Sequence, residues 1–391
     1  MNKNFRKGQN RKSLRKKGSN GRKKSTLDPK RLVSDAKVSK QEKYVAQKSF
    51  QELPLHPALQ QTLTKKGFQF PTEIQEKTLV SILEGNDLLG IAQTGTGKTG
   101  AFIIPMIQQM MKSHQKEFGL VVVPTRELAT QVEQEFKSMT KGLKLYSHCF
   151  IGGTNLQKDL QQLNRKAHIV IATPGRLLDL VQRKAIDLRA FNTLVLDEFD
   201  RMLDMGFIND VQRIIQLMRN RQQTLLFSAT LAKSQKPLIQ EILTTPKMVK
   251  VSNGESTGEN VIQDVIKLES DESKLDVLCD ILNSEGVDKI ILFEETKRRV
   301  DKLTKQLNKR GIVSREIHGD KSQNARQKAL NAFKKGHVKV LVATDVAARG
   351  IDVDDVTHVI NYQVPQSYDT YIHRIGRTGR AGKVGRAFTF V

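Results

Sequence analysis

The segment that decides the fold reads Leu88-Leu89-Gly90-Ile91-Ala92-Gln93-Thr94-Gly95-Thr96-Gly97-Lys98-Thr99. A short apolar run, typical of a buried β-strand, leads into a loop of glycine and threonine that ends in Lys-Thr. This is the pattern of a phosphate-binding loop, with alanine where the strict pattern has glycine. Gly95 and Gly97 would let backbone N–H groups surround the phosphates. Lys98 would reach the phosphate oxygens, and Thr99 would offer its hydroxyl to Mg²⁺. The alternative is a glycine-rich turn without a ligand, which the position between a strand and a helix disfavours.

Strands and helices alternate on the C-terminal side of this loop. Up to residue 251, short apolar runs end in Gly, Pro or Thr, and segments with helical spacing follow them. We expect strands at residues 88–91, 120–123, 169–172, 193–196 and 224–227, and helices that include residues 126–139 and 208–218. This alternation predicts βαβ units and a parallel sheet that is covered on both faces.

A second set of α/β units follows a polar segment. Residues 251–263 (VSNGESTGENVIQ) have the composition of a flexible linker. Further strands are expected at residues 289–293, 312–317, 339–342 and 358–361, and a last run at residues 386–391 is cut off at the chain end. We therefore expect two tandem parallel-sheet α/β domains, at residues 49–250 and 264–391, joined by a flexible linker at residues 251–263.

Positive charge is concentrated in the N-terminal segment. The chain of 391 residues has 65 Lys and Arg against 41 Asp and Glu, a net charge of +24. Residues 1–48 hold 17 of the basic and 3 of the acidic residues, which leaves 48 against 38 for the rest. With few large apolar side chains, residues 1–48 are expected to form a basic disordered tail. Such a tail is attracted to the phosphates of nucleic acid, and the alternative role is to keep the protein in solution.

Other features exclude several classes of protein. No window approaches 18 uninterrupted apolar residues, and the basic N-terminus lacks the apolar core of a secretory signal. Neither a membrane span nor export is expected. The two cysteines, Cys149 and Cys279, are too few and too far apart for a zinc site, and we expect buried thiols in a reducing compartment. We expect a cytoplasmic protein, and nothing in the sequence indicates an obligate oligomer.

Acidic residues follow the expected strand at residues 193–196 and read Asp197-Glu198-Phe199-Asp200. Such a tetrapeptide alone is typical of a solvated loop. At the C-terminal edge of a parallel strand, however, it lies where ligands bind in open α/β sheets. Asp197 would hold Mg²⁺ through water, and Glu198 would orient and deprotonate an attacking water molecule.

Several further motifs accompany these two. In the first half they are Phe50, Gly67-Phe68, Pro71-Thr72 with Gln75, Pro124-Thr125-Arg126-Glu127-Leu128-Ala129, Gly152-Gly153, Thr173-Pro174-Gly175-Arg176 and Ser228-Ala229-Thr230. In the second half they are Ala343-Thr344-Asp345, Arg349-Gly350-Ile351-Asp352 and His373-Arg374-Ile375-Gly376-Arg377-Thr378-Gly379-Arg380. From about Phe50 to its end, the chain resembles the DEAD-box RNA helicases.

This resemblance implies roles for residues in two RecA-like domains. ATP and Mg²⁺ would be bound, with Gln75 at the adenine edge and further nucleotide contacts from Phe50, Phe68, the loop from Ala92 to Thr99, and Asp352. RNA would be bound by the backbone-contacting groups Pro124, Thr125, Arg126, Gly152, Gly153, Thr173, Pro174, Gly175, Arg176 and Thr344. Coupling of hydrolysis to strand separation would involve Asp200, Ser228, Thr230 and His373.

The charge needs of phosphoryl transfer point to two further residues. The transition state requires positive charge on the γ-phosphate, which Arg377 and Arg380 could supply as arginine fingers. They lie in the second domain and Lys98 lies in the first, so the complete site would form only when the domains close.

The resemblance implies an ATP-dependent RNA helicase, an RNA-stimulated ATPase that unwinds duplexes locally or remodels RNA-protein complexes. RNA would be bound largely without regard to sequence, because the motifs offer phosphate-binding groups. One alternative is an ATP-gated RNA clamp or assembly factor without productive unwinding. A DNA translocase of the same fold is disfavoured by the motif around Gln75 and by Thr173-Pro174-Gly175-Arg176.

Two features depart from the family pattern. Phe199 stands where the family usually has alanine, and its ring would have to find room near Ser228-Ala229-Thr230 and His373. The expected effect is on coupling, since Asp197, Glu198 and Asp200 are intact. The chain also ends in a late strand, before the final helix expected in this family, which implies either a truncated sequence or a bare sheet edge.

Overall fold

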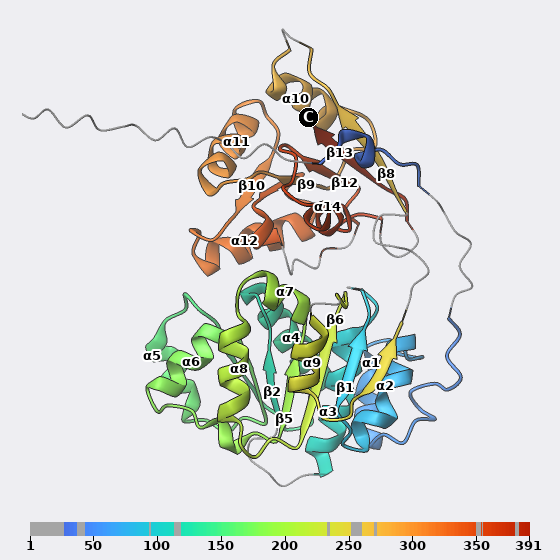
Figure 1. The fold of residues 1–391 in the computed structure, drawn as a ribbon, viewed down its shortest axis with the longest axis vertical. Coiled ribbons are helices and arrows are strands. Elements are labelled where there is room, and N and C mark those ends of the chain that lie inside the picture. The colour runs from blue at the N-terminus through green and yellow to red at the C-terminus, as the bar shows by residue number, and fades with distance from the viewer. Residues whose placement is uncertain are drawn as a thin grey trace, which may run out of the picture.

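The computed structural model shows two α/β domains in tandem, each built on its own parallel sheet (Figure 1). It describes residues 27–36, 44–93, 95–112, 119–232, 235–251, 260–269, 272–348, 353, 355–379 and 383–391. The features expected at Thr94, Asp352 and Arg380, and in residues 1–26 and 252–259, lie outside the described residues. No described helix is long and apolar enough to cross a lipid bilayer.

The first domain is organised around a seven-stranded parallel sheet in the order β3-β4-β2-β5-β6-β1-β7. Its strands are β1 (Leu88–Ile91), β2 (Gly119–Val122), β3 (Ser147–Phe150), β4 (Ile169–Ala172), β5 (Thr193–Leu196), β6 (Gln223–Ser228) and β7 (Lys247–Lys250). Successive side chains point to opposite faces of a strand. Leu194 and Leu196 therefore pack into one hydrophobic cluster and Val195 into another. Both faces are buried, which explains the continuous apolar runs of the sequence.

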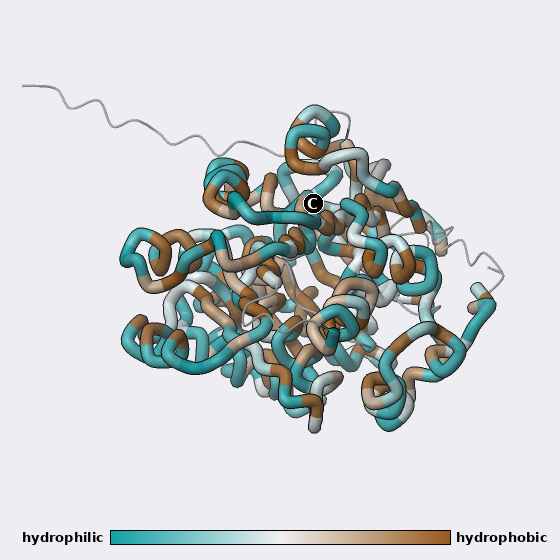
Figure 2. Tube along the Cα trace, turned by 90° about the horizontal axis from the view of Figure 1, so that it is seen from below, coloured by the Kyte–Doolittle hydropathy of each residue, from teal (hydrophilic) through white to brown (hydrophobic). Residues whose placement is uncertain are grey.

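Two groups of helices cover this sheet. The cluster that contains Val195 is completed by α1 (Pro57–Lys65), α2 (Glu73–Leu83), α3 (Lys98–Lys112) and α4 (Arg126–Met139). The opposite cluster is completed by α5 (Leu156–Leu163), α6 (Pro174–Gln182), η2 (Leu188–Ala190), α7 (Phe199–Asp204), α8 (Ile208–Leu217) and α9 (Lys236–Ile242). Figure 2 shows the result: hydrophobic segments lie inside, and hydrophilic turns lie at the periphery.

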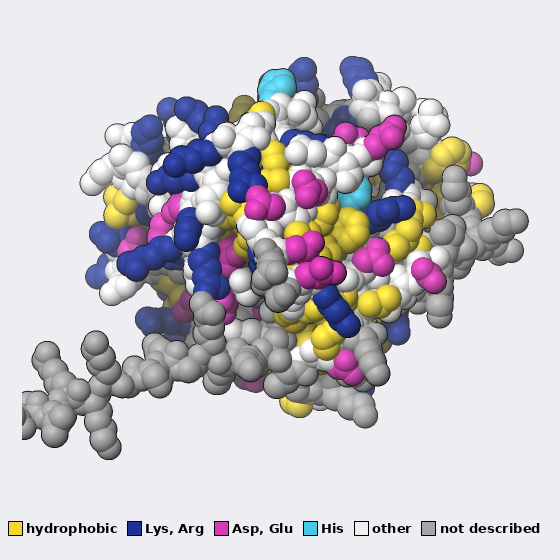
Figure 3. Space-filling view, turned by 90° about the horizontal axis from the view of Figure 1, so that it is seen from above, with side chains coloured by type: hydrophobic (Ala, Val, Ile, Leu, Met, Phe, Trp, Pro, Cys, Tyr) yellow, Lys and Arg dark blue, Asp and Glu magenta, His cyan; other side chains and the backbone are white. Residues whose placement is uncertain are grey.

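The second domain has a six-stranded parallel sheet in the order β10-β11-β9-β12-β13-β8. Its strands are β8 (Val261–Ile266), β9 (Ile290–Phe293), β10 (Ser314–Ile317), β11 (Val340–Ala343), β12 (His358–Asn361) and β13 (Gly385–Phe390). One face packs on α10 (Lys274–Asn283) and α11 (Lys297–Lys309), and the other on α12 (Gln323–Lys334), α13 (Asp345–Ala348) and α14 (Tyr368–Ile375). Seen from above, Lys and Arg side chains gather on the side where α11 lies (Figure 3).

The predicted strands at residues 88–91, 169–172, 193–196 and 358–361 are confirmed, and the other predicted strands differ by one or two residues at their ends. Three strands were not expected, namely β3, β7 and β8. The predicted linker is wrong at its C-terminal end, because residues 261–263 belong to β8. The last strand, β13, pairs with both β12 and β8 and is therefore not a bare edge.

The N-terminal segment also differs from the prediction. Residues 29–32 form a short 3₁₀ helix, η1 (Pro29–Leu32), and Leu32 is fully buried in a hydrophobic cluster of the second domain. The prediction of a disordered tail over residues 1–48 is therefore wrong for residues 27–36, since an apolar side chain in this basic segment has a binding partner in the fold.

Phe199 lies in the core of the first domain. Its ring is fully buried, in the same hydrophobic cluster as Leu196 and Met202. It belongs to α7, whose first turn follows Glu198 directly. These observations favour a packing role for the ring over the coupling role expected from its place in the acidic motif.

We expect Phe199→Ala to lower the free energy of unfolding by about 3–5 kcal/mol, because it leaves a cavity in a packed core. The measurement is denaturant-induced unfolding, with Phe70→Ala as the matched control, since Phe70 is 60% exposed. Equal unfolding midpoints for the two variants would contradict the packing role.

Candidate active site

The predicted functional motifs of the first domain meet at one edge of its sheet. The phosphate loop follows β1, the acidic turn follows β5, and Ser228-Ala229-Thr230 begins at the end of β6, which lies between them. The motifs expected to contact RNA follow β2, β3 and β4, which are also neighbours. Because parallel strands point the same way, their carboxyl ends share an edge. This edge of the sheet therefore has a nucleotide part, at the ends of β1, β5 and β6, and an RNA part, at the ends of β2, β3 and β4.

The phosphate loop has the backbone that its sequence requires. Gly95 and Gly97 have φ angles of +88° and +93°, which favour glycine. A Cβ atom on Gly97 would lie 2.7 Å from the side chains of Gln75 and Thr72. Lys98 opens α3, is buried, and its Nζ has no hydrogen-bond partner among the described residues. A buried ammonium without a partner is costly, and a phosphate group would supply the missing acceptor.

Gln75 connects the helix α2 to the phosphate loop. Its Oε1 accepts from the backbone N–H of Thr72 (3.0 Å), and its Nε2 donates to the carbonyl oxygen of Gly97 (3.0 Å). Phe50 is buried in the core and meets Phe68 edge-on, with ring centroids 6.3 Å apart. Phe50 therefore supports the ring of Phe68, and its own contact with the nucleotide stays a prediction.

The acidic turn is buried and conformationally unusual. Glu198 has a left-handed backbone (φ 56°, ψ 49°), which is uncommon for a residue with a side chain. The backbone N–H of Glu198 donates to the Asp197 carboxylate (2.9 Å). The Glu198 carboxylate accepts from the guanidinium of Arg201 (2.5 Å), and both side chains are buried. Arg201, which the sequence analysis missed, thus fixes the direction of the expected base.

The Asp197 side chain suits a bound cation. Burial raises the pKa of Asp197 to about 6, and Glu198 adds to this, while the charge of Lys98 opposes it. A cation would favour the charged carboxylate. Oxygen atoms are the ligands that Mg²⁺ prefers, and Thr99, in the first turn of α3, offers a hydroxyl. These residues fit the predicted Mg²⁺.

Ser228-Ala229-Thr230 is joined to the acidic turn. The Thr230 hydroxyl donates to the Asp200 carboxylate (3.2 Å), and the Ser228 hydroxyl donates to the carbonyl oxygen of Thr230 (2.7 Å). The other carboxylate oxygen of Asp200 is buried and has no hydrogen-bond partner among the described residues. The two motifs therefore form one connected polar unit that can accept a further donor.

Arg126 lies against the Gly152-Gly153 turn. A Cβ atom on Gly153 would come within 2.4 Å of the Arg126 guanidinium, and Gly153 has a φ angle of +79°. Thr125 caps α4 by accepting from the backbone N–H of Leu128 (3.3 Å). Two of the predicted RNA motifs therefore pack directly against each other, at the ends of β2 and β3.

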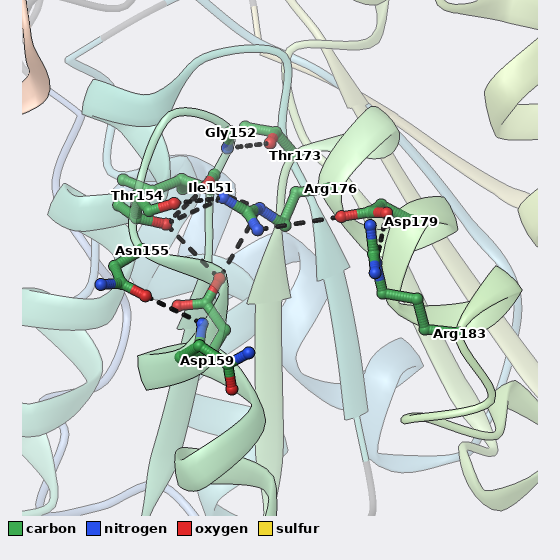
Figure 4. Close-up of polar contacts among 10 residues, drawn as sticks. Ile151, Gly152, Thr154, Asn155, Asp159, Thr173, Arg176, Asp179 and Arg183 are labelled. Carbon is green, nitrogen blue, oxygen red and sulfur yellow. Dashed lines mark hydrogen bonds and ion pairs between the residues drawn. The ribbon is translucent and has the colours of Figure 1, made fainter.

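Arg176 holds the same turn together from the other side (Figure 4). It donates to the carbonyl oxygens of Ile151 (3.2 Å) and Thr154 (2.7 Å), and it pairs with Asp159 at 3.6 Å. Burial raises the pKa of Asp159, and Arg176 opposes this shift. The sequence suggested that this guanidinium contacts RNA. In the structure it organises the turn, and only 8% of its side chain is exposed.

We expect Gly153→Ala to weaken RNA binding, because the added methyl group would displace Arg126 and strain the backbone. Gly142→Ala is the matched control, since its φ angle of +87° gives similar backbone strain but a Cβ atom there meets nothing within 4 Å. The measurement is RNA affinity at fixed salt, with ATP affinity as a second readout. A similar loss in both variants, or in ATP affinity, would contradict the assignment of this turn.

The second domain positions its motifs through internal contacts. Asp345 pairs with Arg374 through two short contacts (2.6 and 2.8 Å), which ties α13 to α14. Thr344 is buried next to Asp345. Arg377 is also buried, and its Nε donates to the carbonyl oxygen of His373 (3.4 Å). Among the described residues, no hydrogen bond or ion pair joins Arg377 to Lys98 or Glu198.

A buried ion pair joins the two domains. Arg326 of α12 donates to the carboxylate of Glu127 in α4 (2.9 Å), and Gln323 donates to its other oxygen (3.3 Å). Burial lowers the pKa of Arg326, and Glu127 opposes this shift. Glu127 belongs to the motif Pro124-Thr125-Arg126-Glu127-Leu128-Ala129, whose residue pattern does not predict a contact between domains. Gln323 and Arg326 are three residues apart on a helix, a spacing that places both on one face.

Comparison with known proteins decides the family. The DEAD/DEAH box helicase profile matches residues 72–238, and the helicase conserved C-terminal domain profile matches residues 273–382. The structure of S. cerevisiae Dbp5 bound to RNA and ADP BeF3 is 32% identical, with a TM-score of 0.77, over 88% of this chain and 89% of that one. The chain belongs to the DEAD-box helicases. The predicted family and the pair of RecA-like domains are confirmed.

Other relatives agree with this assignment. The chain is 46% identical over 344 residues to the DEAD-box ATP-dependent RNA helicase CshA of Streptococcus pneumoniae and 43% identical over 343 residues to that of Bacillus cereus. These matches cover 88% of this chain and 65% of the length of the relatives. The structure of Mss116p bound to ssRNA and AMP-PNP is 32% identical, with a TM-score of 0.78, over 89% of this chain and 76% of that one.

Proposed function

We propose that this DEAD-box chain is an ATP-dependent RNA helicase that couples ATP hydrolysis to closure of its two domains on single-stranded RNA. One observation carries the proposal: the buried ammonium of Lys98, which has no hydrogen-bond partner in the described part of the chain, and the buried acidic turn lie at the same sheet edge. An ammonium and carboxylates arranged in this way suit a nucleotide triphosphate with its metal ion.

On this proposal, the nucleotide lies along the phosphate loop. Backbone N–H groups from Ala92 to Thr99 and the Lys98 ammonium bind the phosphates, and Gln75 and Phe68 face the adenine. Asp197 and Thr99 hold Mg²⁺, which neutralises charge on the phosphate oxygens when it is bound. Glu198, directed by Arg201, accepts the proton of the attacking water.

The second domain completes this site on closure. Arg377 and Arg380 provide positive charge for the transition state, and Asp352 adds a nucleotide contact. One carboxylate oxygen of Asp200 has no hydrogen-bond partner among the residues that the structure describes, which supports a coupling role, because it can accept a donor such as His373 from the facing domain. The pair Glu127–Arg326 already joins the two domains at the neighbouring part of the sheet edge.

On this proposal, the protein binds RNA through the phosphates of the RNA backbone. Phosphate contacts come from Pro124 to Arg126, from Gly152 and Gly153, from the start of α6 at Thr173 to Gly175, and from Thr344 in the second domain. Arg176 acts by shaping the turn. These are backbone N–H groups, hydroxyls and one guanidinium, which carry no base information. Binding is therefore largely independent of sequence, and bending of one strand on closure separates a few base pairs.

The test compares ATP turnover of the chain alone with turnover in the presence of single-stranded RNA, single-stranded DNA and duplex RNA, together with strand separation per ATP. Stimulation by RNA with strand separation supports the helicase. Stimulation and long-lived RNA retention without strand separation identify an ATP-gated clamp instead. Equal stimulation by DNA would contradict RNA as the substrate.

A further inference from the structure

A site on the second domain is occupied by the chain's own N-terminal segment. Leu32 is fully buried there in the same cluster as Val261 and Tyr371. Ser34 and Gln263 exchange two backbone hydrogen bonds (3.1 and 2.8 Å) as an antiparallel bridge at the outer edge of the sheet. The Tyr371 hydroxyl lies 3.3 Å from the carbonyl oxygen of Leu32 and 2.9 Å from Oε1 of Gln263. The site is therefore defined by one buried leucine side chain and one antiparallel backbone pairing.

The same segment is anchored on the first domain a few residues later. The Tyr44 hydroxyl donates to the Glu76 carboxylate, which also accepts from the backbone N–H groups of Gln47 (3.1 Å) and Lys48 (3.3 Å). Burial and Glu76 raise the pKa of Tyr44 to about 12. Figure 1 shows η1 against the second domain, although the next helices in the sequence, α1 and α2, belong to the first.

We propose that the edge of the second domain formed by β8 and α14 is a docking site for residues 29–34, and that the docked segment is a second, releasable connection between the domains. If the segment served only as a connection to the first domain, that role would not require Leu32 to be buried in the second domain. The neighbouring Val33 is 54% exposed, so the burial is specific to one side chain.

The length and the position of this connection determine how it restricts the movement of the two domains. Seven residues separate Ala36 from Tyr44, a span of at most about 29 Å. Ser34 pairs with β8, the strand that begins directly after the linker between the domains. A single connection limits the separation of two domains but does not fix their rotation about it. Two connections side by side also restrict that rotation, so the facing edges stay oriented toward each other.

The docking is weak enough to be reversible. One buried leucine, one pair of backbone hydrogen bonds and the contact of the Tyr371 hydroxyl with the Leu32 carbonyl oxygen are opposed by the entropy of ordering the segment. Residues 1–26 contain 11 Lys and Arg and no Asp or Glu. Docking therefore also brings the second domain next to the C-terminal end of this polybasic segment in the sequence.

The first test is hydrogen exchange of the full chain. Leu32→Asp should release the segment from the site, and the backbone N–H of Gln263 then loses its acceptor, the carbonyl oxygen of Ser34. Hydrogen exchange in residues 260–266 should therefore be faster by about tenfold or more. Val33→Asp is the matched control, because it adds the same charge at an exposed neighbour. Ser34→Pro, which removes the backbone donor to Gln263 without touching the core, should act like Leu32→Asp, and Leu32→Met should behave like wild type. Unchanged exchange in Leu32→Asp would overturn the docking site.

The second test measures how the domains move. Donor and acceptor dyes are placed at Lys141→Cys and Lys305→Cys, with Cys149 and Cys279 replaced by serine. Without nucleotide or RNA, Leu32→Asp should broaden the distribution of transfer efficiencies, and Val33→Asp should not. Identical distributions would overturn the connecting role. In ATP turnover, Leu32→Asp should raise the RNA concentration that gives the half-maximal rate and leave the maximal rate unchanged. This expectation alone rests on the proposed function. If the wild-type chain hydrolyses no ATP, the helicase proposal fails while both tests of docking still stand.

Discussion

Glu198→Gln should reduce RNA-stimulated ATP turnover by about 10²–10⁴-fold, because an amide cannot take the proton of the attacking water. Glutamine keeps an oxygen that can accept from Arg201, so the buried guanidinium keeps a partner and the left-handed turn is retained. ATP binding should remain, because Lys98 and the phosphate loop are untouched. The variant should therefore accumulate a closed, RNA-bound state.

The measurement is single-turnover hydrolysis at saturating ATP and RNA, with nucleotide affinity determined separately. Glu241→Gln is a matched control, since Glu241 is exposed on α9 of the same domain. Turnover by Glu198→Gln at more than half of the wild-type rate would show that this carboxylate is not the base.

Arg377→Ala should lower the maximal RNA-stimulated rate by about 10³-fold or more, the usual effect of removing an arginine finger. Arg377 lies in the second domain, so loss of its side chain should leave the affinity of the first domain for ATP largely unchanged. The loss should therefore appear in kcat and only weakly in KM for ATP.

Arg298→Ala controls for the loss of one positive charge, because Arg298 is exposed on α11. Arg377 is buried, so unfolding of each variant must be measured as well. A stable Arg377→Ala variant with a wild-type rate would mean that the second domain supplies its charge through another residue.

The strands that could be predicted from the sequence are those buried on both faces. The run at residues 193–196 is apolar throughout because both faces of β5 are covered. β3 was missed because Ser147 and His148 interrupt its apolar pattern, and β7 because its lysines are exposed at a sheet edge. β8 was missed because the polar residues of the linker run into it.

The candidate site could be predicted as motifs but not as contacts. The residue pattern, together with its place directly after an apolar strand, identified the phosphate loop and the acidic turn. It could not show that the Arg176 guanidinium faces Ile151 and Thr154, or that Arg201 faces Glu198, because these partners are set by the folded turn. The pair Glu127–Arg326 joins residues almost 200 positions apart, and no local pattern records such a contact.

Hydrolysis by residues 49–250 alone tests the division of the catalytic site most directly. This domain has two hydrophobic clusters of its own, so we expect it to fold, which circular dichroism can verify. It should bind ATP through the phosphate loop and show no RNA-stimulated hydrolysis, because Arg377 and Arg380 are missing. If it hydrolysed ATP at the full RNA-stimulated rate of the whole chain, no residue of the second domain could be required for the chemistry, and the split site would be contradicted.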